Sequence, residues 1–143
     1  MLLVKTKLGL SSIDGIGLFA DQFIAKGTRV WQWSDGFDIR VKASELERLS
    51  PQALETFLRY SFLSKRTGLY VLCFDNARFL NHSVTPNLND TSADDSEEGL
   101  DVAIRDIHPG EELTSDYRDF DGETVQKMAN IKECHVREPA GML

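Results

Sequence analysis

A short polar stretch in the middle of the chain holds the side chains best suited to chemistry. Residues 78–87 are Arg-Phe-Leu-Asn-His-Ser-Val-Thr-Pro-Asn, and they follow an apolar lead-in at residues 69–74. Three consecutive hydrogen-bonding side chains, Asn81, His82 and Ser83, therefore stand where a strand ends and a proline stops regular structure. Such a loop could hold a polar ligand, or it could be a capped turn whose side chains bond their own backbone.

Two other segments carry patterns that bear on this choice. Residues 15–20, Gly-Ile-Gly-Leu-Phe-Ala, place two glycines where a backbone could approach a ligand closely, because glycine has no Cβ. Residues 110–117, Gly-Glu-Glu-Leu-Thr-Ser-Asp-Tyr, end in a tyrosine that is either a half-buried core residue or a polar group of a site. Long stretches of chain separate the three motifs, so a shared site requires a fold that brings them together.

The same residues permit two other kinds of site. Residues 15–20 match the Gly-x-Gly-x-x-Ala pattern of dinucleotide-binding oxidoreductases, with Asp35 near the place of a ribose-binding carboxylate. Polar residues precede the first glycine, however, and too few residues follow for a crossover helix. A nucleophilic site on Cys73, or on Ser83 with His82, is also disfavoured, because adjacent residues rarely face one another and Cys73 lies in an apolar run.

The three motifs, in this order, resemble the signatures of the SET-domain protein lysine methyltransferases. Residues 78–87 and 110–117 resemble two specific signatures of the family, and residues 15–20 fit its less specific Gly-x-Gly. The resemblance covers about residues 10–121. It implies a mostly β fold of short strands in several small sheets, with a pseudoknot-like threading of the C-terminal segment. We expect a single SET domain over residues 1–143.

The resemblance also implies a cofactor and the residues that hold it. Members of the family bind S-adenosylmethionine, and the matching positions in this chain are Gly15, Ile16, Gly17, Asn81 and His82. A methyl group on the cofactor's sulfur and a neutral lysine amine must meet in line within a narrow channel. The expected activity is therefore methyl transfer to a lysine of a protein.

The family's active-site tyrosine corresponds to Tyr117, whose hydroxyl is expected where the methyl group and the amine meet. Ser115 stands where many members carry an aromatic ring that borders the lysine pocket. A serine there predicts room for repeated methylation, unless Tyr60, Tyr70 or Phe120 fills the space, because protein interiors seldom leave a ring-sized void. A second class of function is a SET-like module that binds a peptide or the cofactor without turnover.

The chain departs from the family pattern in two places. Val84 stands where many members have a cysteine, and the cysteine-rich zinc module that often follows the tyrosine is missing. Only Cys134 and His135 occur in that region, so no four-ligand zinc site can be assembled and no metal is expected. The lysine channel must be closed in another way, for which Phe120 and a predicted helical tail over residues 123–135 are candidates.

Composition narrows the choice of partners. The chain has 143 residues and a net charge of -7, which opposes binding to nucleic acid and favours a basic, lysine-rich protein such as a histone. Two cysteines cannot form a disulfide framework, and no apolar run is long enough for a signal peptide or a membrane span. We expect an intracellular, reducing compartment, without a preference between cytoplasm and nucleus. The sequence does not predict the oligomeric state.

The elements that must position the motifs follow from local patterns. Strands are predicted at residues 2–8, 17–25, 28–33, 69–74, 101–107 and 112–115. A helical insertion is expected at about residues 44–63, with a capping box that starts at Ser44 and a second helix that starts at Ser50-Pro51. Pro109-Gly110 predicts a type II turn. Residues 90–98 hold five carboxylates and are expected to form a solvated insertion.

Overall fold

The computed structural model describes residues 1–123, which contain all three motifs. The predicted tail helix over residues 123–135 lies outside the described residues beyond Glu123. Within the described range the strands are β1 (Thr6–Leu10), β2 (Ile16–Ala20), β3 (Arg29–Gln32), β4 (Ile39–Val41), β5 (Phe62–Leu63), β6 (Tyr70–Leu72), β7 (Asn81–His82), β8 (Leu88–Ala93), β9 (Ser96–Ala103) and β10 (Thr114–Ser115). The helical segments are η1 (Ala43–Arg48), α1 (Pro51–Tyr60), η2 (Asn76–Phe79) and η3 (Tyr117–Asp119).

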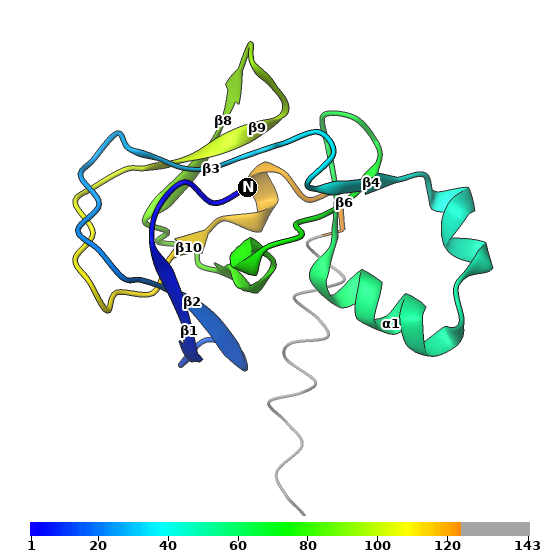
Figure 1. Cartoon of the computed structure of the whole chain (residues 1–143), viewed down its shortest axis with the longest axis horizontal. Helices are drawn as coiled ribbons and strands as arrows, with labels where there is room; N and C mark the ends of the chain where they lie inside the picture. Colours follow the sequence, from blue (N-terminus) through cyan, green and yellow to red (C-terminus); the bar gives the residue numbers. More distant parts are fainter. Residues whose placement is uncertain (124–143) are drawn as a thin grey trace, which may run out of the picture.

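These strands form four small sheets, as the family resemblance implied. β1 pairs with β2, β7 pairs with β10, and two three-stranded sheets have the orders β3-β9-β8 and β4-β6-β5. All of these pairs are antiparallel except the β7–β10 pair, which is parallel. The helical insertion containing η1 and α1 extends from the β4-β6-β5 sheet on one side of the molecule (Figure 1).

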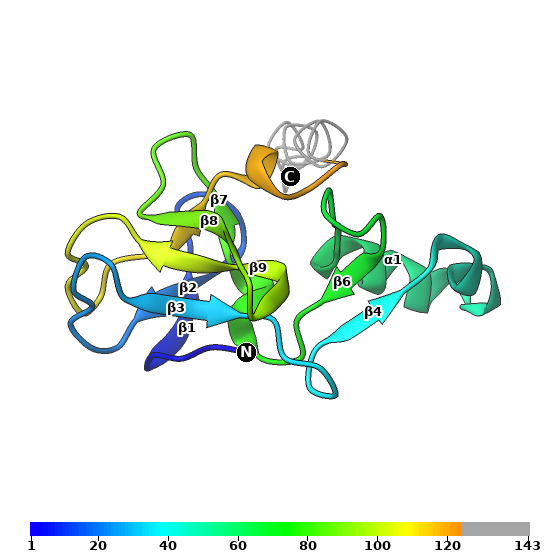
Figure 2. The same ribbon diagram turned by 90° about the horizontal axis from the view of Figure 1, so that it is seen from above.

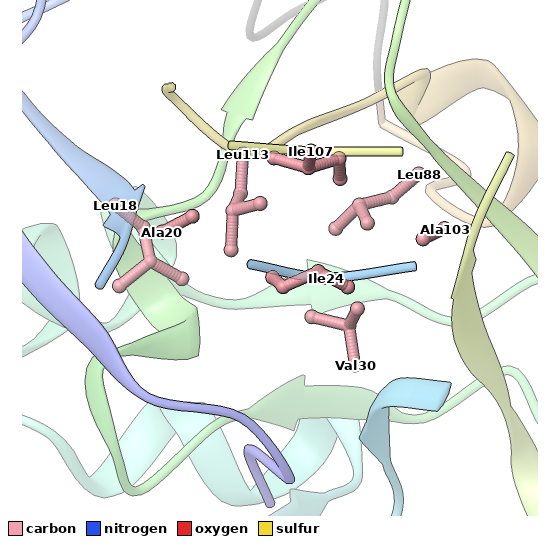
Figure 3. Packing of buried hydrophobic residues seen from close by; sticks show 8 residues of the cluster. All are labelled: Leu18, Ala20, Ile24, Val30, Leu88, Ala103, Ile107 and Leu113. Atoms are coloured by element: carbon pink, nitrogen blue, oxygen red, sulfur yellow. The ribbon is translucent and has the colours of Figure 1, made fainter. Parts of the chain in front are cut away.

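The main core lies between β2, β3 and the β8–β9 hairpin. Its buried side chains come from these strands and from the segments that connect them (Figure 3): Leu18, Ala20, Ile24, Val30, Leu88, Ala103, Ile107 and Leu113. A smaller cluster of Trp31, Trp33, Val71 and Cys73 joins the β3 strand to β6. Burial of these apolar groups fixes the sheets relative to one another, so the polar motifs at their ends are held in place.

The predicted type II turn at Pro109-Gly110 is confirmed. The Glu111 amide donates to the carbonyl of His108 at 3.1 Å, and Gly110 has a φ of 91°, which a residue with a side chain rarely adopts. The turn sends the chain back along β2, where the Leu113 amide donates to the carbonyl of Leu18 at 2.7 Å. The segment carrying the last motif is therefore aligned by backbone pairing with the strand that carries the first.

The helical insertion is present, but its predicted caps and end need correction. In η1 the Glu45 carboxylate accepts from the Lys42 amide at 2.7 Å, so the capping box starts at Lys42 and not at Ser44. Ser50 does cap α1, because its hydroxyl accepts from the Ala53 amide at 3.2 Å. The helix ends at Tyr60 and not near residue 63, because the next residues pair with β6.

The prediction of a solvated acidic insertion at residues 90–98 is right for Asp94, Asp95 and Glu97, which are exposed, and wrong for Asp90 and Glu98, which face inward on the β8–β9 hairpin. Asp90 forms an ion pair with Arg66 at 2.7 Å, and Glu98 accepts from the Thr67 hydroxyl at 2.7 Å. Glu98 is only 2% exposed. Strand alternation turns some of the carboxylates inward, which a count of charges does not reveal.

Several strand boundaries differ from the predicted ones, most of all in β9. The strand predicted at residues 101–107 starts earlier, at Ser96, and ends at Ala103. Ile107 pairs only through an isolated bridge with Ile24. None of the helices within residues 1–123 is long and apolar enough to cross a membrane.

Replacement of Asp101 by asparagine should stabilise the protein at alkaline pH. Burial, followed by the nearby Asp90 carboxylate, raises the pKa of Asp101 to about 7, against about 3.9 for an exposed aspartate. The folded protein therefore binds more protons than the unfolded chain between these values, and Asp101 lowers stability as pH rises through this window. Asp101→Asn removes the penalty, so we expect its melting temperature at pH 8 to exceed that of the parent by about 3 °C or more.

Melting curves measured by circular dichroism from pH 5 to pH 8 provide the check. The advantage of the variant should shrink as pH falls, because the parent carboxyl becomes neutral as well. An equal or lower melting temperature of Asp101→Asn at pH 8 would show that the charged form of Asp101 is well accommodated.

Candidate active site

The parallel pair β7–β10 brings the second and third motifs together. Asn81 is paired with Thr114 and His82 with Ser115, and the Ser83 amide donates to the Ser115 carbonyl at 3.1 Å. The chain then turns into η3, which starts at Tyr117. The pair consists of two residues from each strand. It places the third motif beside the second, although more than thirty residues separate the two strands in the sequence.

Glu112 connects all three motifs, although no pattern in the sequence singled it out. Its carboxylate accepts from the Ser11 hydroxyl at 2.8 Å and from the Asn81 side-chain amide at 2.9 Å. A Cβ on Gly17 would overlap this carboxylate, so a larger residue at the second glycine of the first motif would displace the Glu112 side chain. The same Asn81 amide donates to the carbonyl of Asp14 at 3.1 Å. An acidic residue within a short predicted strand is the signal that could have identified Glu112.

The first motif forms the tip and second strand of an antiparallel hairpin. Gly15 has a φ of 46° at the turn between β1 and β2, and Ile16 is 48% exposed beside it. The strand is followed by no crossover helix, so the dinucleotide-binding interpretation is wrong. Asp35, its proposed ribose ligand, accepts instead from the indole N–H of Trp33 at 3.1 Å.

The hydroxyl of Tyr117 is fixed by the backbone next to the second motif. It donates to the Leu80 carbonyl, and the Tyr117 amide donates to Nδ1 of His82 at 3.1 Å. Its ring lies 5.3 Å from the His82 ring and 5.7 Å from the Phe120 ring, measured between centroids. Burial, followed by the charge of Asp121, raises the pKa of Tyr117 far above its ordinary value. Tyr117 is therefore a neutral phenol with an oriented oxygen.

An adjacent carboxylate anchors the segment that carries Tyr117. Asp116 caps η3 by accepting from the Arg118 amide at 3.0 Å, and its carboxylate lies 3.7 Å from Nδ1 of His82. Hydrogen bonds from the Arg118 side chain lower the pKa of Asp116 to about 2. Asp116 thus remains charged over any ordinary pH range, and it fixes the start of η3 through its bonds to Arg118.

A cleft opens beside Tyr117. Tyr60, Phe120 and Tyr117 itself are among the residues of its wall. The cleft lies where the β3-β9-β8 sheet approaches α1 and the end of the described chain, which Figure 2 draws in orange above both sheets. Aromatic rings around such a space suit a methylated or charged amine.

Two residues predicted for the lysine pocket are placed differently from Tyr60 and Phe120. The Tyr70 hydroxyl donates to Glu123 at 2.6 Å, a bond that together with burial raises the pKa of Tyr70 to about 12. Ser115 is 0% exposed, and neither residue belongs to the cleft wall. Tyr60 does belong to it, and its ring packs 5.3 Å from that of Phe79. The predicted effect of Ser115 on repeated methylation stays a prediction.

The nucleophilic alternative finds no support in the structure. Cys73 is 8% exposed in the smaller core cluster, and burial strongly raises the pKa of its thiol. A protonated thiol is a poor nucleophile. The Ser83 hydroxyl accepts from the Thr85 amide at 3.1 Å, as in a capped turn. Within residues 1–123, no group of three or more acidic, histidine or cysteine side chains could hold a metal ion.

Two arginines near the first and second motifs provide positive charge that no carboxylate neutralises within residues 1–123. Arg59 approaches to 3.9 Å from the position that a Cβ of Gly15 would take, and Arg78 lines the same cleft. Among these residues neither has a carboxylate partner at 4 Å, and each guanidinium instead lies over a neighbouring aromatic ring. Both arginines line the cleft and can attract an anionic group of a ligand, such as the carboxylate of an amino acid.

The predicted cofactor residues are clustered, although they lie beside the cleft and not in its wall. Gly15, Ile16 and Gly17 are held to Asn81 through the loop contacts described above, and His82 lies next to Tyr117. The Asn81 amide is occupied by protein atoms, so its direct effect is to shape the loop. Their roles toward a cofactor remain predictions.

Comparisons with known proteins identify the family of the chain. The family model of the SET domain matches residues 15–118. Among curated proteins, no sequence matches the chain.

Several solved structures share the fold. Chaetomium thermophilum Polycomb Repressive Complex 2 bound to GSK126 is 25% identical with a TM-score of 0.64, over 89% of this chain and 17% of that chain. The same complex, autoinhibited and bound to S-adenosylmethionine, is 24% identical with a TM-score of 0.63, over 91% of this chain and 17% of that chain. A Plasmodium falciparum protein assigned as a histone methyltransferase is 18% identical with a TM-score of 0.56, over 81% of this chain and 95% of that chain.

This chain thus spans a small part of the Chaetomium chains and most of the length of the Plasmodium one. The family model covers well over half of the chain and includes the whole of each of the three motifs. The chain belongs to the SET domain family.

Proposed function

We propose that this protein transfers a methyl group from S-adenosylmethionine to a lysine side chain of a basic protein. The observation that carries the proposal is the position of the Tyr117 hydroxyl. It is fixed by the Leu80 carbonyl, borders the cleft, and lies beside the His82 and loop residues that match the family's cofactor motif. Membership of the family and the S-adenosylmethionine named for one similar structure support the choice of cofactor.

The loop around Gly15 and the two arginines are suited to hold the cofactor. S-adenosylmethionine carries a methyl group on a positively charged sulfur, and it also carries a carboxylate that needs a cationic partner. Arg59 and Arg78 supply that charge, and the exposed loop at Ile16 offers backbone groups held in place by Asn81. Each of these groups is positioned before a ligand arrives, which lowers the entropy cost of binding.

Tyr117 acts on the reacting groups through the dipole of its hydroxyl and does not act as a base that removes the proton of the lysine. Its hydroxyl proton is directed to Leu80, so the lone pairs of its oxygen remain available to attract a methyl group or an amine N–H. Because its pKa lies far above the ordinary value, the phenol stays neutral and does not remove a proton from the substrate. The incoming lysine must reach the cleft as the neutral amine or lose its proton to another group.

The charge of the chain supports a basic substrate. A net charge of -7 favours encounter with a lysine-rich segment and disfavours a nucleic acid. Histones have this character, and two similar structures are named for Polycomb Repressive Complex 2 or for histone methyltransferase activity. We therefore propose a lysine-rich protein of histone-like character as the substrate class.

Isothermal titration calorimetry should show binding of S-adenosylmethionine and none of a nicotinamide dinucleotide. Asn81→Ala should weaken the binding of S-adenosylmethionine by about 1 to 3 kcal/mol, because the loop loses the buried amide that fixes it. Asn89→Ala is the matched control, since Asn89 is exposed on β8 and should leave the affinity unchanged. Dinucleotide binding with no affinity for S-adenosylmethionine would refute the proposed function.

Tyr117→Phe should keep the affinity for S-adenosylmethionine within about twofold while it lowers turnover by roughly 100-fold. The variant retains the ring that packs on His82 and Phe120 and loses only the hydroxyl bound to Leu80. Transfer of labelled methyl groups to a histone mixture measures turnover, and calorimetry measures the affinity. Turnover equal to that of the parent would remove Tyr117 from the reaction.

The rate of methyl transfer should rise about tenfold per pH unit between pH 7 and pH 9 when chemistry is limiting. The amine of an unperturbed lysine has a pKa of about 10.4, so its neutral fraction grows with pH in this range. Tyr117 does not contribute to this rise, because its pKa lies above its ordinary value. Single-turnover rates on one lysine peptide test this, and a flat profile would mean that the site deprotonates the lysine before transfer.

The same measurements separate the enzyme from a catalytically silent module. Incorporation of labelled methyl groups into a basic protein supports the enzyme. Binding of S-adenosylmethionine without incorporation into any of several lysine-rich proteins would favour a module that binds cofactor or peptide alone.

A further inference from the structure

Four acidic side chains of the described chain line the cleft that contains Tyr117, and the three besides Asp121 belong to the β8–β9 hairpin and have no part in the proposed chemistry. Asp90 comes from β8, and Glu98 and Asp101 come from β9. Asp90 and Asp101 are directly paired across the two strands, so both side chains lie on the same face of the hairpin. Glu98 is 2% exposed and Asp101 is 8% exposed.

The cations near this cluster do not balance its charge. Arg66 forms an ion pair with Asp90 at 2.7 Å. Arg40 reaches Glu98 at 3.3 Å but is closer to Glu97, at 2.6 Å. In the described part of the chain, Asp101 has no cationic partner within 4 Å.

The protonation of Asp101 reflects this lack of a partner. Burial, followed by the charge of Asp90, raises the pKa of Asp101 to about 7. A cation that binds next to the cluster would favour the charged form of Asp101 and would be attracted in return.

Two polar atoms in the cleft wall are buried without a hydrogen-bond partner among residues 1–123. One is Oε2 of Glu98, an acceptor, and the other is Nε1 of Trp31. Buried polar atoms in native proteins nearly always have partners, so each marks a position where a ligand or a water completes the bonding. The Trp31 residue is 6% exposed and is paired with Asp101 in the β3–β9 ladder. Both atoms therefore belong to the same wall as the carboxylates.

The arrangement favours an organic cation over a metal ion or the cofactor. No group of acidic side chains within residues 1–123 could hold a metal ion, so the three carboxylates are too dispersed for a small divalent cation. The cofactor's carboxylate would be repelled here, and it has two arginines, Arg59 and Arg78, on other segments of the cleft. An ammonium or guanidinium group is large enough to contact several dispersed carboxylates and can donate several hydrogen bonds.

We propose that Asp90, Glu98 and Asp101 form a subsite for a basic side chain of the polypeptide substrate, next to Tyr117. The identity of the occupant as a substrate side chain rests on the proposed function, but the cation binding itself does not. A bound cation attracts the Glu98 carboxylate, whose buried Oε2 has no hydrogen-bond partner among residues 1–123, and the carboxylates of Asp90 and Asp101 supply the remaining negative charge. This subsite selects lysine-rich or arginine-rich segments over neutral ones.

Binding of small cations to the full chain tests the subsite without any cofactor. The probes are n-butylammonium and n-butylguanidinium, with n-butanol as the neutral control, titrated at pH 7.5 and followed by NMR chemical shifts of β8 and β9. We expect saturable binding of the cations and none of the alcohol. Glu98→Gln should weaken cation binding at least fivefold, because it removes the charge and leaves the shape nearly unchanged.

Glu97→Gln is the matched control. Glu97 is the neighbouring residue and shares Arg40 with Glu98, but its side chain is 69% exposed and is not part of the cleft wall. This variant should bind the cations within twofold of the parent. If Glu98→Gln fails to fold, Asp101→Asn replaces it and should weaken binding by a similar factor.

The outcomes distinguish the subsite from the proposed function. Cation binding that is equal in the parent, Glu98→Gln and Asp101→Asn, or equally strong for the alcohol, overturns the subsite even where methyl transfer is observed. Cation binding that depends on Glu98, in a protein that neither binds S-adenosylmethionine nor transfers methyl groups, supports the subsite and refutes the proposed function.

With an active enzyme, replacement of a neighbouring basic residue in a lysine peptide by norleucine should raise KM several-fold for the parent and less for Glu98→Gln.

Discussion

The hydrogen bonds of the Glu112 carboxylate are the constraint on which the rest of the site depends. They join the hairpin of the first motif, through Ser11, to the Asn81 amide of the second motif, and Glu112 itself belongs to the third. A partly buried carboxylate needs such donors, because an unpaired charge away from water is costly. A Cβ on Gly17 would overlap this carboxylate and displace it from its donors. One group therefore constrains Ser11 and Gly17 in the first hairpin together with Asn81, more than sixty residues further along the chain.

Local patterns allowed a mostly β domain to be predicted, with six of the ten strands found within residues 1–123, whereas β4, β5, β7 and β8 were not predicted. The turn at Pro109-Gly110 and the cap at Ser50 involve only neighbouring residues, and both are confirmed. The end of α1 could not be predicted, because Phe62 and Leu63 leave the helix to pair with β6. That pairing is a tertiary contact, which outweighs a helical pattern of apolar residues.

Residues of the candidate site could be predicted where they belong to a family motif. They could not be predicted where contacts between residues distant in the sequence determine the arrangement. Tyr117 and His82 were singled out, and the structure places them in contact. The acidic run was partly misjudged because its charges were counted without partners, whereas Asp90 is matched by Arg66 from another part of the chain. The bonds of Glu112 and Asn81 also join residues that no local pattern connects. A sequence supplies residue types, but which carboxylate faces inward depends on strand register.

The parallel pairing of β7 with β10 also has a consequence for the order in which the molecule forms. Each strand contributes only two residues, so the pair gains little hydrogen bonding to offset the entropy of closing a loop of some thirty residues. It can persist only after the β8–β9 hairpin within that loop has folded onto the core. The tyrosine and its neighbours are thus expected to assemble late, after the hydrophobic scaffold. A nascent chain would lack this arrangement until β10 had emerged from the ribosome.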